Sequence, residues 1–245
     1  MSKLATLSWG NDQFRVGPWN ADERLAYLAV APTVTKPTVA GVERAVRVLA
    51  ERGFIGVTTA ALRPTDTSAF SAAGFRERER LVILRHDLED LTEPGPPAPS
   101  DAGAIRLVRP GRRDRRSVID VDHAAFTRPW WLDNDGLDDA LRATPRVRFR
   151  VATDRVDTTR GLLGYSIIGR SDRTGYVQRL AVRPERSGAG LGRHLLADGL
   201  TWLRRRGATS ALVNTQGQNQ RALELYLRAG FVVEPYELTV MERSL

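Results

Sequence analysis

The sequence contains no cysteine and no long uninterrupted run of apolar residues. Without cysteine there is no disulfide framework, no thiolate metal site and no cysteine nucleophile, and we predict no metal site. The apolar runs are short and interrupted by arginine, which excludes a membrane-spanning helix. The first residues, MSKLATLSWGND, lack the apolar core of a secretory signal. We therefore expect a cytoplasmic protein with no membrane partner.

Lysine is nearly absent, because Lys3 and Lys36 are the only lysines among the 37 basic residues. Residues 1–100 carry equal numbers of basic and acidic side chains, so the net charge of +8 belongs entirely to residues 101–245. A basic domain beside a neutral one suits a phosphorylated or acidic ligand. For any single arginine, plain solvation on the surface is an equally good interpretation.

One segment divides the 245 residues into two parts. It reads EDLTEPGPPAPSDAG, from Glu89 to Gly103, and contains four prolines and two glycines. A proline-rich polar segment buries too little apolar surface to fold, and it acts as an extended spacer. We predict a linker at 91–103, a truncated unit at 1–90 and a second unit at 104–245.

Residues 104–245 alternate between the apolar spacing of strands and that of helices. Strands are expected at 104–110, 149–154, 160–170, 175–184, 210–216 and 236–244. Helices are expected at 112–126, 135–144, 193–207 and 219–231, and the last two close at Gly207 and Gly230. This order predicts an α/β (α+β) fold, a sheet with helices between its strands.

Three landmarks recur in the same order in the two parts of the chain. LAVAP resembles LAVRP, AVRVLAERG resembles LTWLRRRG, and AFSAAGF resembles ELYLRAGF; these segments end at Pro32 and Pro184, Gly53 and Gly207, and Phe75 and Phe231. The common order favours a duplicated unit over coincidence. The first copy is truncated, because fewer residues precede its LAVAP.

Three glycines open the helix expected at 193–207, in the segment RPERSGAGLGRHLL. A Walker-type loop needs a lysine, and a dinucleotide fingerprint needs G-x-G-x-x-G, whereas Gly188, Gly190 and Gly192 give G-x-G-x-G. A glycine-rich turn that enters a helix still points unpaired N–H groups at an anion and lets it approach closely. The alternative is a tight strand–helix connection with no ligand.

Two motifs carry a resemblance to a known family. Val182 and Pro184, followed by SGAGLG at 187–192, resemble the acyl-CoA motif of the GCN5-related N-acetyltransferase (GNAT) family. NQRALELYLRAGF resembles the second motif of that family at Asn219, Ala222, Leu225, Tyr226, Gly230 and Phe231. The resemblance covers essentially all of residues 104–245.

The resemblance implies a splayed mixed sheet with acetyl-CoA, the co-substrate, between the LAV strand and the ALVN strand. The pyrophosphate would bind the amides of the glycine turn, and the backbone of the LAV strand would bind the pantetheine and polarise the thioester carbonyl. The implied binding residues are Leu180, Ala181, Val182, Ser187, Gly188, Ala189, Gly190, Leu191, Gly192, Arg193 and Asn219.

Tyr226 suits the role of general acid. Acetyl transfer to an amine expels a thiolate whose conjugate acid has a pKa of about 8.5, judged from cysteine, and a phenol with a pKa of about 10 is protonated at neutral pH. The alternative is a packing tyrosine, because Tyr226 shares an apolar stripe with Leu223 and Leu227.

The general base is open, because Gln178 stands where many family members have glutamate, and an amide cannot accept the proton. Asp133, Asp135 and His123 are alternatives, as are a water relay and an acceptor amine of low pKa.

Ser187 is a second departure, since the family prefers arginine or glutamine there. Arg186 or Arg193 could supply the missing charge.

The first copy departs further from the family. TVTKPTVAG stands in place of the glycine turn, and Phe70 stands where the second copy has Tyr226. We therefore expect the first copy not to catalyse. The tandem arrangement, with its degenerate first half, resembles mycothiol synthase-like acetyltransferases, from which the short first copy differs.

The sequence therefore predicts an N-acetyltransferase that moves an acetyl group directly from acetyl-CoA to a primary amine on a small molecule or a protein. Trp130, Trp131 and the acids from Asp133 to Asp139 could line the acceptor site, or they could be core residues and a solvated helix start. A non-catalytic acyl-CoA sensor is the alternative function. Nucleic-acid binding is disfavoured, because no basic motif is interleaved with aromatic residues. The acceptor and the oligomeric state, including a homodimer, are open.

Overall fold

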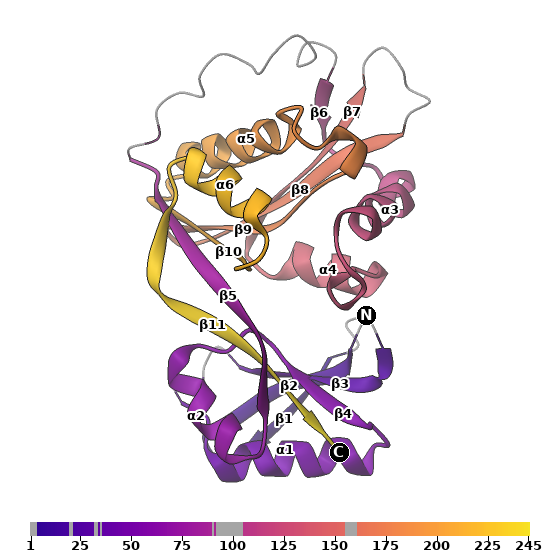
Figure 1. The fold of residues 1–245 in the computed structure, drawn as a ribbon, viewed down its shortest axis with the longest axis vertical. Coiled ribbons are helices and arrows are strands. Elements are labelled where there is room, and N and C mark those ends of the chain that lie inside the picture. The colour runs from indigo at the N-terminus through magenta and orange to yellow at the C-terminus, as the bar shows by residue number, and fades with distance from the viewer. Residues whose placement is uncertain are drawn as a thin grey trace. The chain divides into compact units, whose positions relative to one another are not determined.

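The computed structural model describes residues 4–19, 22–31, 34, 36–89, 91, 105–154 and 161–245. Two compact units divide the chain, and each contains strands and helices (Figure 1). Unit 1 comprises Met1–Ile83, Thr215–Asn219 and Glu234–Leu245, and unit 2 comprises Leu84–Asn214 and Gln220–Val233. None of the helices in these described ranges is long and apolar enough to cross a membrane.

Unit 2 has the alternating elements that the sequence predicts. In chain order they are β6 (Ile105–Val108), α3 (Arg115–Ala125), α4 (Asn134–Arg142), β7 (Arg146–Asp154), β8 (Leu162–Ser171), β9 (Thr174–Val182), α5 (Leu191–Arg205), β10 (Ser210–Gln216) and α6 (Gln220–Arg228). Hydrogen-bonded neighbours follow the order β10-β9-β8-β7-β6, parallel between β10 and β9 and antiparallel elsewhere. The predicted mixed sheet flanked by helices is confirmed.

Helices cover both faces of the unit 2 sheet (Figure 1). On one face α5 packs Leu191 and Leu195 against β7 and β8, with β6 and β9 alongside. On the other face α3 and α4 pack against β7, β8 and β9, and their core residues include Val118, Val121, Leu137, Tyr165 and Ile167. Residues that alternate along β9 therefore face different helices.

Unit 1 is built from the first half of the chain and the final strand. Its elements are β1 (Ala5–Trp9), β2 (Asp12–Trp19), β3 (Asp22–Val30), α1 (Val39–Glu51), β4 (Gly56–Thr59), α2 (Pro64–Ala72), most of β5 (Arg76–Asp87) and most of β11 (Val232–Ser244). Both helices and strands β2 to β4 enclose one core, which includes Phe14, Leu28, Leu49, Phe70 and Met241.

The two halves repeat one structural pattern. The order β3-α1-β4-α2 matches β9-α5-β10-α6, and in each copy the two strands pair in parallel. Left-handed glycines close the equivalent helices, Gly53 at φ +86° and Gly207 at φ +79°. The second helices also end alike, because the Phe75 amide donates to the Phe70 carbonyl and the Phe231 amide to the Tyr226 carbonyl, both at 3.0 Å. The predicted tandem repeat is confirmed.

Each unit contains a strand from the other half of the chain. In unit 1, β4 pairs with the C-terminal end of β11, where Glu242 lies opposite Thr58. In unit 2, the end of β5 brings His86 within 5.2 Å of the Phe231 ring, measured between ring centroids. The predicted boundaries at 90 and 104 stay a prediction, and the predicted linker lies outside the described residues except for Leu91.

Gly230 lies where a strand of the first half packs against the end of α6. Its φ is +91°, and a Cβ there would lie 3.0 Å from His86 Nε2. We expect Gly230→Ala to lower the free energy of unfolding by more than the roughly 1–2 kcal/mol of a left-handed backbone. Gly207→Ala is the matched control, because φ is +79° and the nearest atom to its Cβ is 4.0 Å away. Urea unfolding followed by circular dichroism measures both losses, and equal losses would contradict the packing role of Gly230.

Candidate active site

The glycine turn joins β9 to α5. Gly188 has φ +85° and Gly190 has φ +78°, values that cost a residue with a side chain about 1–2 kcal/mol. Gly192 differs from these two glycines. A Cβ there would make only ordinary contacts of 3.4 Å or more with Leu225, Leu180 and Val182. Internal packing therefore does not require glycine at 192, and its absent side chain leaves the backbone accessible.

The first turn of α5 presents N–H groups without a cap. Gly190 occupies the N-cap position, and no side chain of the described residues accepts a hydrogen bond from the amides that follow it. The first N–H groups of a helix have no acceptor within the helix, and the helix dipole makes this end partly positive. The turn therefore has the chemistry of an anion site, as the sequence predicts for a pyrophosphate.

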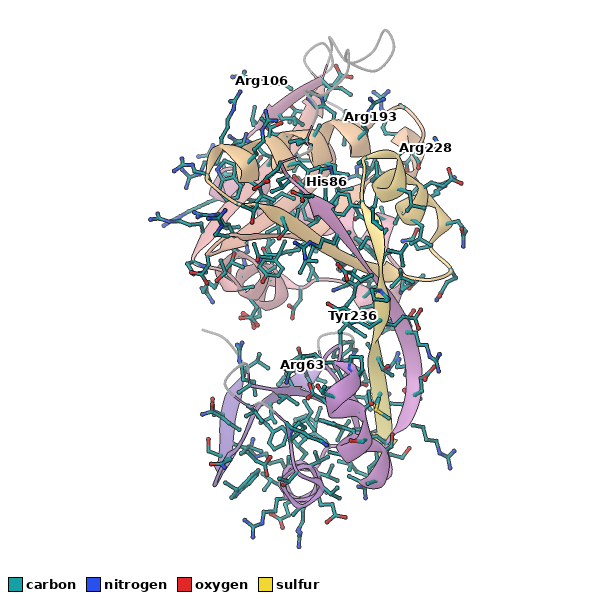
Figure 2. All side chains as sticks on the ribbon, turned by 90° about the vertical axis from the view of Figure 1, so that its left-hand side faces the viewer. Arg63, His86, Arg106, Arg193, Arg228 and Tyr236 are labelled. Atoms are coloured by element: carbon teal, nitrogen blue, oxygen red, sulfur yellow. The ribbon has the colours of Figure 1, made fainter. Side chains whose placement is uncertain are left out.

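The arginines near the turn differ in whether they are bonded to other residues. Arg186 forms an ion pair with Asp154 at 3.3 Å. Arg221, on α6, donates to the Ser187 hydroxyl at 3.2 Å, and the sequence analysis missed it. Arg193 is exposed on the first turn of α5 (Figure 2) and forms no hydrogen bond or ion pair with any described residue. Arg193 therefore lies within the uncapped first turn itself, and Arg221 contacts the glycine turn at Ser187.

The backbone of β9 has an open edge. Its ladder with β10 runs only from Thr174 to Tyr176, although β9 continues to Val182. The Arg183 amide donates to the Leu163 carbonyl at 2.9 Å. Since backbone groups alternate along an antiparallel pair, Ala181 bonds toward β8, and Leu180 and Val182 present their N–H and C=O groups to the open edge. An extended ligand could pair there.

A bulge interrupts β9 at Gln178. Val177 lies opposite Ile168 and Arg179 opposite Ile167, which leaves Gln178 as the extra residue. The Gln178 side chain donates through Nε2 to Thr144 Oγ1 at 3.3 Å, and its Oε1 is buried without a partner in the described chain. The amide is therefore held in place, and it has no proton-accepting group to offer as a base.

Tyr226 is buried on α6, with 6% of its surface exposed and its ring centroid 5.5 Å from that of Phe231. Burial raises the pKa of the Tyr226 hydroxyl above its ordinary value, and the cation of Arg179 offsets a smaller part. No described residue hydrogen-bonds this hydroxyl. Tyr226 therefore carries its proton throughout the neutral pH range.

The proposed alternatives for the base have structural roles. His123 stacks on Trp131 with 4.4 Å between ring centroids, and its Nε2 lies 2.9 Å from the Leu132 carbonyl. Asp133 caps α4 by accepting a hydrogen bond from the Gly136 amide at 2.7 Å. Asp135 lies in the first turn of α4. Within the described chain, neither His123 nor Asp133 forms a hydrogen bond or ring contact with Tyr226.

Sequence reasoning missed a polar cluster on the α3 and α4 face. Asp122 is fully buried and accepts hydrogen bonds from the Tyr165 hydroxyl at 2.5 Å, from the Leu132 amide at 2.8 Å and from Arg179 at 2.8 and 3.0 Å. We call this group the Asp122 cluster; it comprises Asp122, Phe126, Trp130, Leu132, Tyr165 and Arg179. One clue was available, because Asp122 interrupts the apolar stripe that Val118 and Val121 define at helical spacing.

The first repeat fills the equivalent helix N-terminus with its own carboxylate. Asp12 accepts hydrogen bonds from the Thr38 amide at 2.9 Å and the Thr38 hydroxyl at 2.5 Å, directly before α1. A Cβ at Gly41 would lie 2.2 Å from Asp12 Oδ2, so glycine is needed for this carboxylate to fit. The start of α1 is therefore occupied from within the protein.

Comparison with known proteins agrees with this architecture. Residues 116–231 match the Acetyltransferase (GNAT) family. The mycothiol acetyltransferase of Actinosynnema mirum is 32% identical over 168 residues, which are 64% of this chain and 53% of that protein. The mycothiol acetyltransferase of Salinispora arenicola is 32% identical over 218 residues, which are 83% of this chain and 68% of that protein.

The fold is also found among solved structures. A tandem GNAT protein from the clavulanic acid biosynthesis pathway superposes with a TM-score of 0.70 at 14% identity, and the match covers 95% of this chain and 78% of that one. The alignment spans about half the length of the Actinosynnema relative, 53%. From the sequence similarity, the motifs and the shared fold, the chain belongs to the GNAT acetyltransferase family.

Proposed function

We propose that this protein transfers an acetyl group from acetyl-CoA to a primary amine, directly and in a ternary complex. The observation that carries the proposal is the construction of β9. The C-terminal end of this strand leads into the uncapped glycine turn, Leu180 and Val182 before the turn present an open backbone edge, and the middle of the strand is bulged at Gln178. A single strand can thus bind the phosphates, the pantetheine and the thioester of one extended donor.

Acetyl-CoA fits the donor set of this strand and turn. The amides from Gly188 to Arg193 would bind the pyrophosphate, with Arg193 and Arg221 adding positive charge. Leu180 and Val182 would pair with the pantetheine arm through their backbone. Ser187, Ala189 and Leu191 belong to the same turn, and Asn219 directly precedes α6, with its amide donating to the Gln216 carbonyl at 2.9 Å.

Tyr226 would supply the proton for the leaving group. The amine nitrogen forms a bond to the thioester carbon, the carbon–sulfur bond breaks, and the thiolate takes the hydroxyl proton of Tyr226. The attacking nitrogen releases one proton to solvent as the amide forms, and the tyrosinate recovers one proton from solvent, so the step is balanced. Because Gln178 cannot accept the proton of the acceptor, the amine must reach the site in its neutral form or lose its proton to water.

The relatives named mycothiol acetyltransferase make a mycothiol-type acceptor one candidate for this chain. A non-catalytic acyl-CoA sensor is the second candidate function, and the amide at Gln178 is the observation that favours it.

We also propose that only the second repeat binds acetyl-CoA, because Asp12 already occupies the start of α1. These proposals differ in turnover and in the number of bound acetyl-CoA molecules.

A charge placed in the glycine turn tests the donor site. Gly188→Glu puts a carboxylate where the pyrophosphate would bind, so we expect acetyl-CoA affinity to fall by about tenfold or more. Gly207→Glu is the matched control, because Gly188 and Gly207 have φ of +85° and +79° and neither Cβ would meet an atom closer than 4.0 Å. Isothermal titration calorimetry measures the dissociation constant and the stoichiometry.

We expect one acetyl-CoA per chain and a Gly207→Glu affinity close to that of the unaltered protein. Equal losses in the two variants would show that strain, not the turn, sets the affinity. Two sites per chain would contradict the role given to Asp12.

Tyr226→Phe tests the acid. Loss of a positioned general acid lowers kcat by about 10²–10⁴-fold, whereas stability should change little because no described residue bonds the hydroxyl. Phe70, which occupies the equivalent position of the first repeat, shows that the same backbone accommodates phenylalanine. Thiol release measures kcat, and calorimetry confirms that acetyl-CoA still binds.

The pH profile gives an independent reading of the same residue. A raised pKa keeps the acid protonated to higher pH, so kcat/KM should rise as the acceptor amine becomes neutral, with no fall below about pH 10. Turnover that survives in Tyr226→Phe would remove this residue from the chemistry.

A further inference from the structure

Arg179 is the cation closest along the chain to the bulge of β9. A regular strand turns successive side chains to opposite faces, but the extra residue of a bulge breaks this alternation. Gln178 packs beside Gly169 and Thr144, and Arg179 packs beside Asp122 and Phe126. Both side chains therefore face the α3 and α4 side of the sheet.

Three residues hold the guanidinium of Arg179 in place. Its Nε and Nη2 donate to the two oxygens of Asp122 at 2.8 and 3.0 Å, and Nη2 also donates to the Trp130 carbonyl. The ring of Phe126 lies under the guanidinium, 3.7 Å from the ring centroid to Cζ. Asp122 is itself fully buried and bonded to Tyr165 and Leu132. The orientation of the guanidinium plane is thus fixed by the residues around it.

One amino group of Arg179 stays free. The side chain is 16% exposed, although Nε and Nη2 are engaged. Nη1 forms no hydrogen bond with any described residue, and it is not among the buried polar atoms that lack a partner in the described chain. Solvent therefore reaches Nη1, whose N–H groups lie at a fixed position beside the bulge.

The pairing and packing of β9 favour one direction of approach for the acceptor. The ladder between β9 and β10 closes at Tyr176, so an extended donor along Leu180 and Val182 would end beside the bulge. The side chains of Leu180 and Val182 pack with α5, which covers the opposite face. An amine that meets the thioester must then come from the face where Arg179 lies.

We propose that Arg179 determines acceptor specificity by binding, through Nη1, a carbonyl or carboxylate oxygen on the carbon next to the acceptor amine. The inference rests on the proposed function and names the class of its substrate. Gln178 points the same way, because without a base the site favours an amine that is neutral at working pH. The α-amine of a peptide-like group has a pKa of about 8, against about 10.4 for a lysine amine.

Three small acceptors separate the possibilities. Glycinamide carries the carbonyl oxygen, glycine carries the carboxylate, and ethylamine carries neither. With rates corrected for the fraction of neutral amine, we expect kcat/KM to be about tenfold or more higher for glycinamide or glycine than for ethylamine, mainly through KM. The comparison of glycinamide with glycine decides between carbonyl and carboxylate. Ethylamine as good as both in the unaltered protein would overturn the inference without any variant.

Arg179→Lys tests the residue itself. Lysine keeps the charge beside Asp122 but loses the planar fork of the guanidinium. The ratio of kcat/KM for glycinamide or glycine to that for ethylamine should therefore fall toward one. Where that variant is unstable, the double variant Asp122→Asn with Arg179→Gln removes both charges together and avoids an unpaired buried carboxylate. Arg148→Gln is the matched control, because Arg148 likewise donates through Nε and Nη2 to both oxygens of one carboxylate, that of the more exposed Asp198, on the α5 side.

The failures of the two proposals are distinguishable. If acetyl-CoA binds and no amine is acetylated, the proposed function fails. If amines are acetylated and the preference is unchanged in the Arg179 variants, or is lost equally in Arg148→Gln, the role of Arg179 fails and the proposed function stands.

Discussion

The first amides of a helix need acceptors, and the two repeats meet this requirement in opposite ways. In unit 1 the carboxylate of Asp12 and the hydroxyl of Thr38 provide them at the start of α1. In unit 2 the start of α5 has glycine at the cap and, among the described residues, no side-chain acceptor. The same strand–helix element is thus self-contained in one copy and dependent on an external anion or water in the other. The donor site we propose follows from this difference.

The strand before α5, β9, adds to that anion site an open backbone edge and a bulge, which make it a candidate active site. Because the β9–β10 ladder closes at Tyr176, a ligand anchored at the glycine turn has a length of open strand to follow and then a bulge where it must end. The bulge turns Arg179 toward the Asp122 cluster, whose buried carboxylate fixes the guanidinium. In the function we propose, backbone geometry positions acetyl-CoA, and the buried ion pair positions a hydrogen-bond donor, Arg179, for the acceptor. An unpaired carboxylate at Asp122 would be costly, so each member of this pair requires the other.

Local patterns in the sequence were enough for the elements of residues 104–245, the tandem repeat and the family motifs. Glycines at 53, 74, 207 and 230 all have positive φ, which is why the ends of the repeated helices were readable. Contacts between distant residues were not readable. Arg221 and Ser187 are 34 residues apart, and Arg179 and Asp122 are 57 residues apart. Their pairing depends on how strands align and helices pack, which composition and periodicity do not encode.

The sequence also did not predict that β5 and β11 each extend into the unit formed mainly by the other half of the chain. The apolar pattern of a strand does not specify which neighbouring strand it pairs with. The extension of β5 gives the first half of the chain a place in unit 2. His86, at the end of β5 (Figure 2), packs edge-on against Phe231, which in turn contacts the ring of Tyr226. The turn between Tyr226 and Phe231 is held by Gly230, whose missing Cβ leaves the room that His86 occupies. A half that lacks both the glycine turn and the tyrosine therefore still supports the proposed acid, since the helix that carries Tyr226 ends against a strand that only the first half supplies.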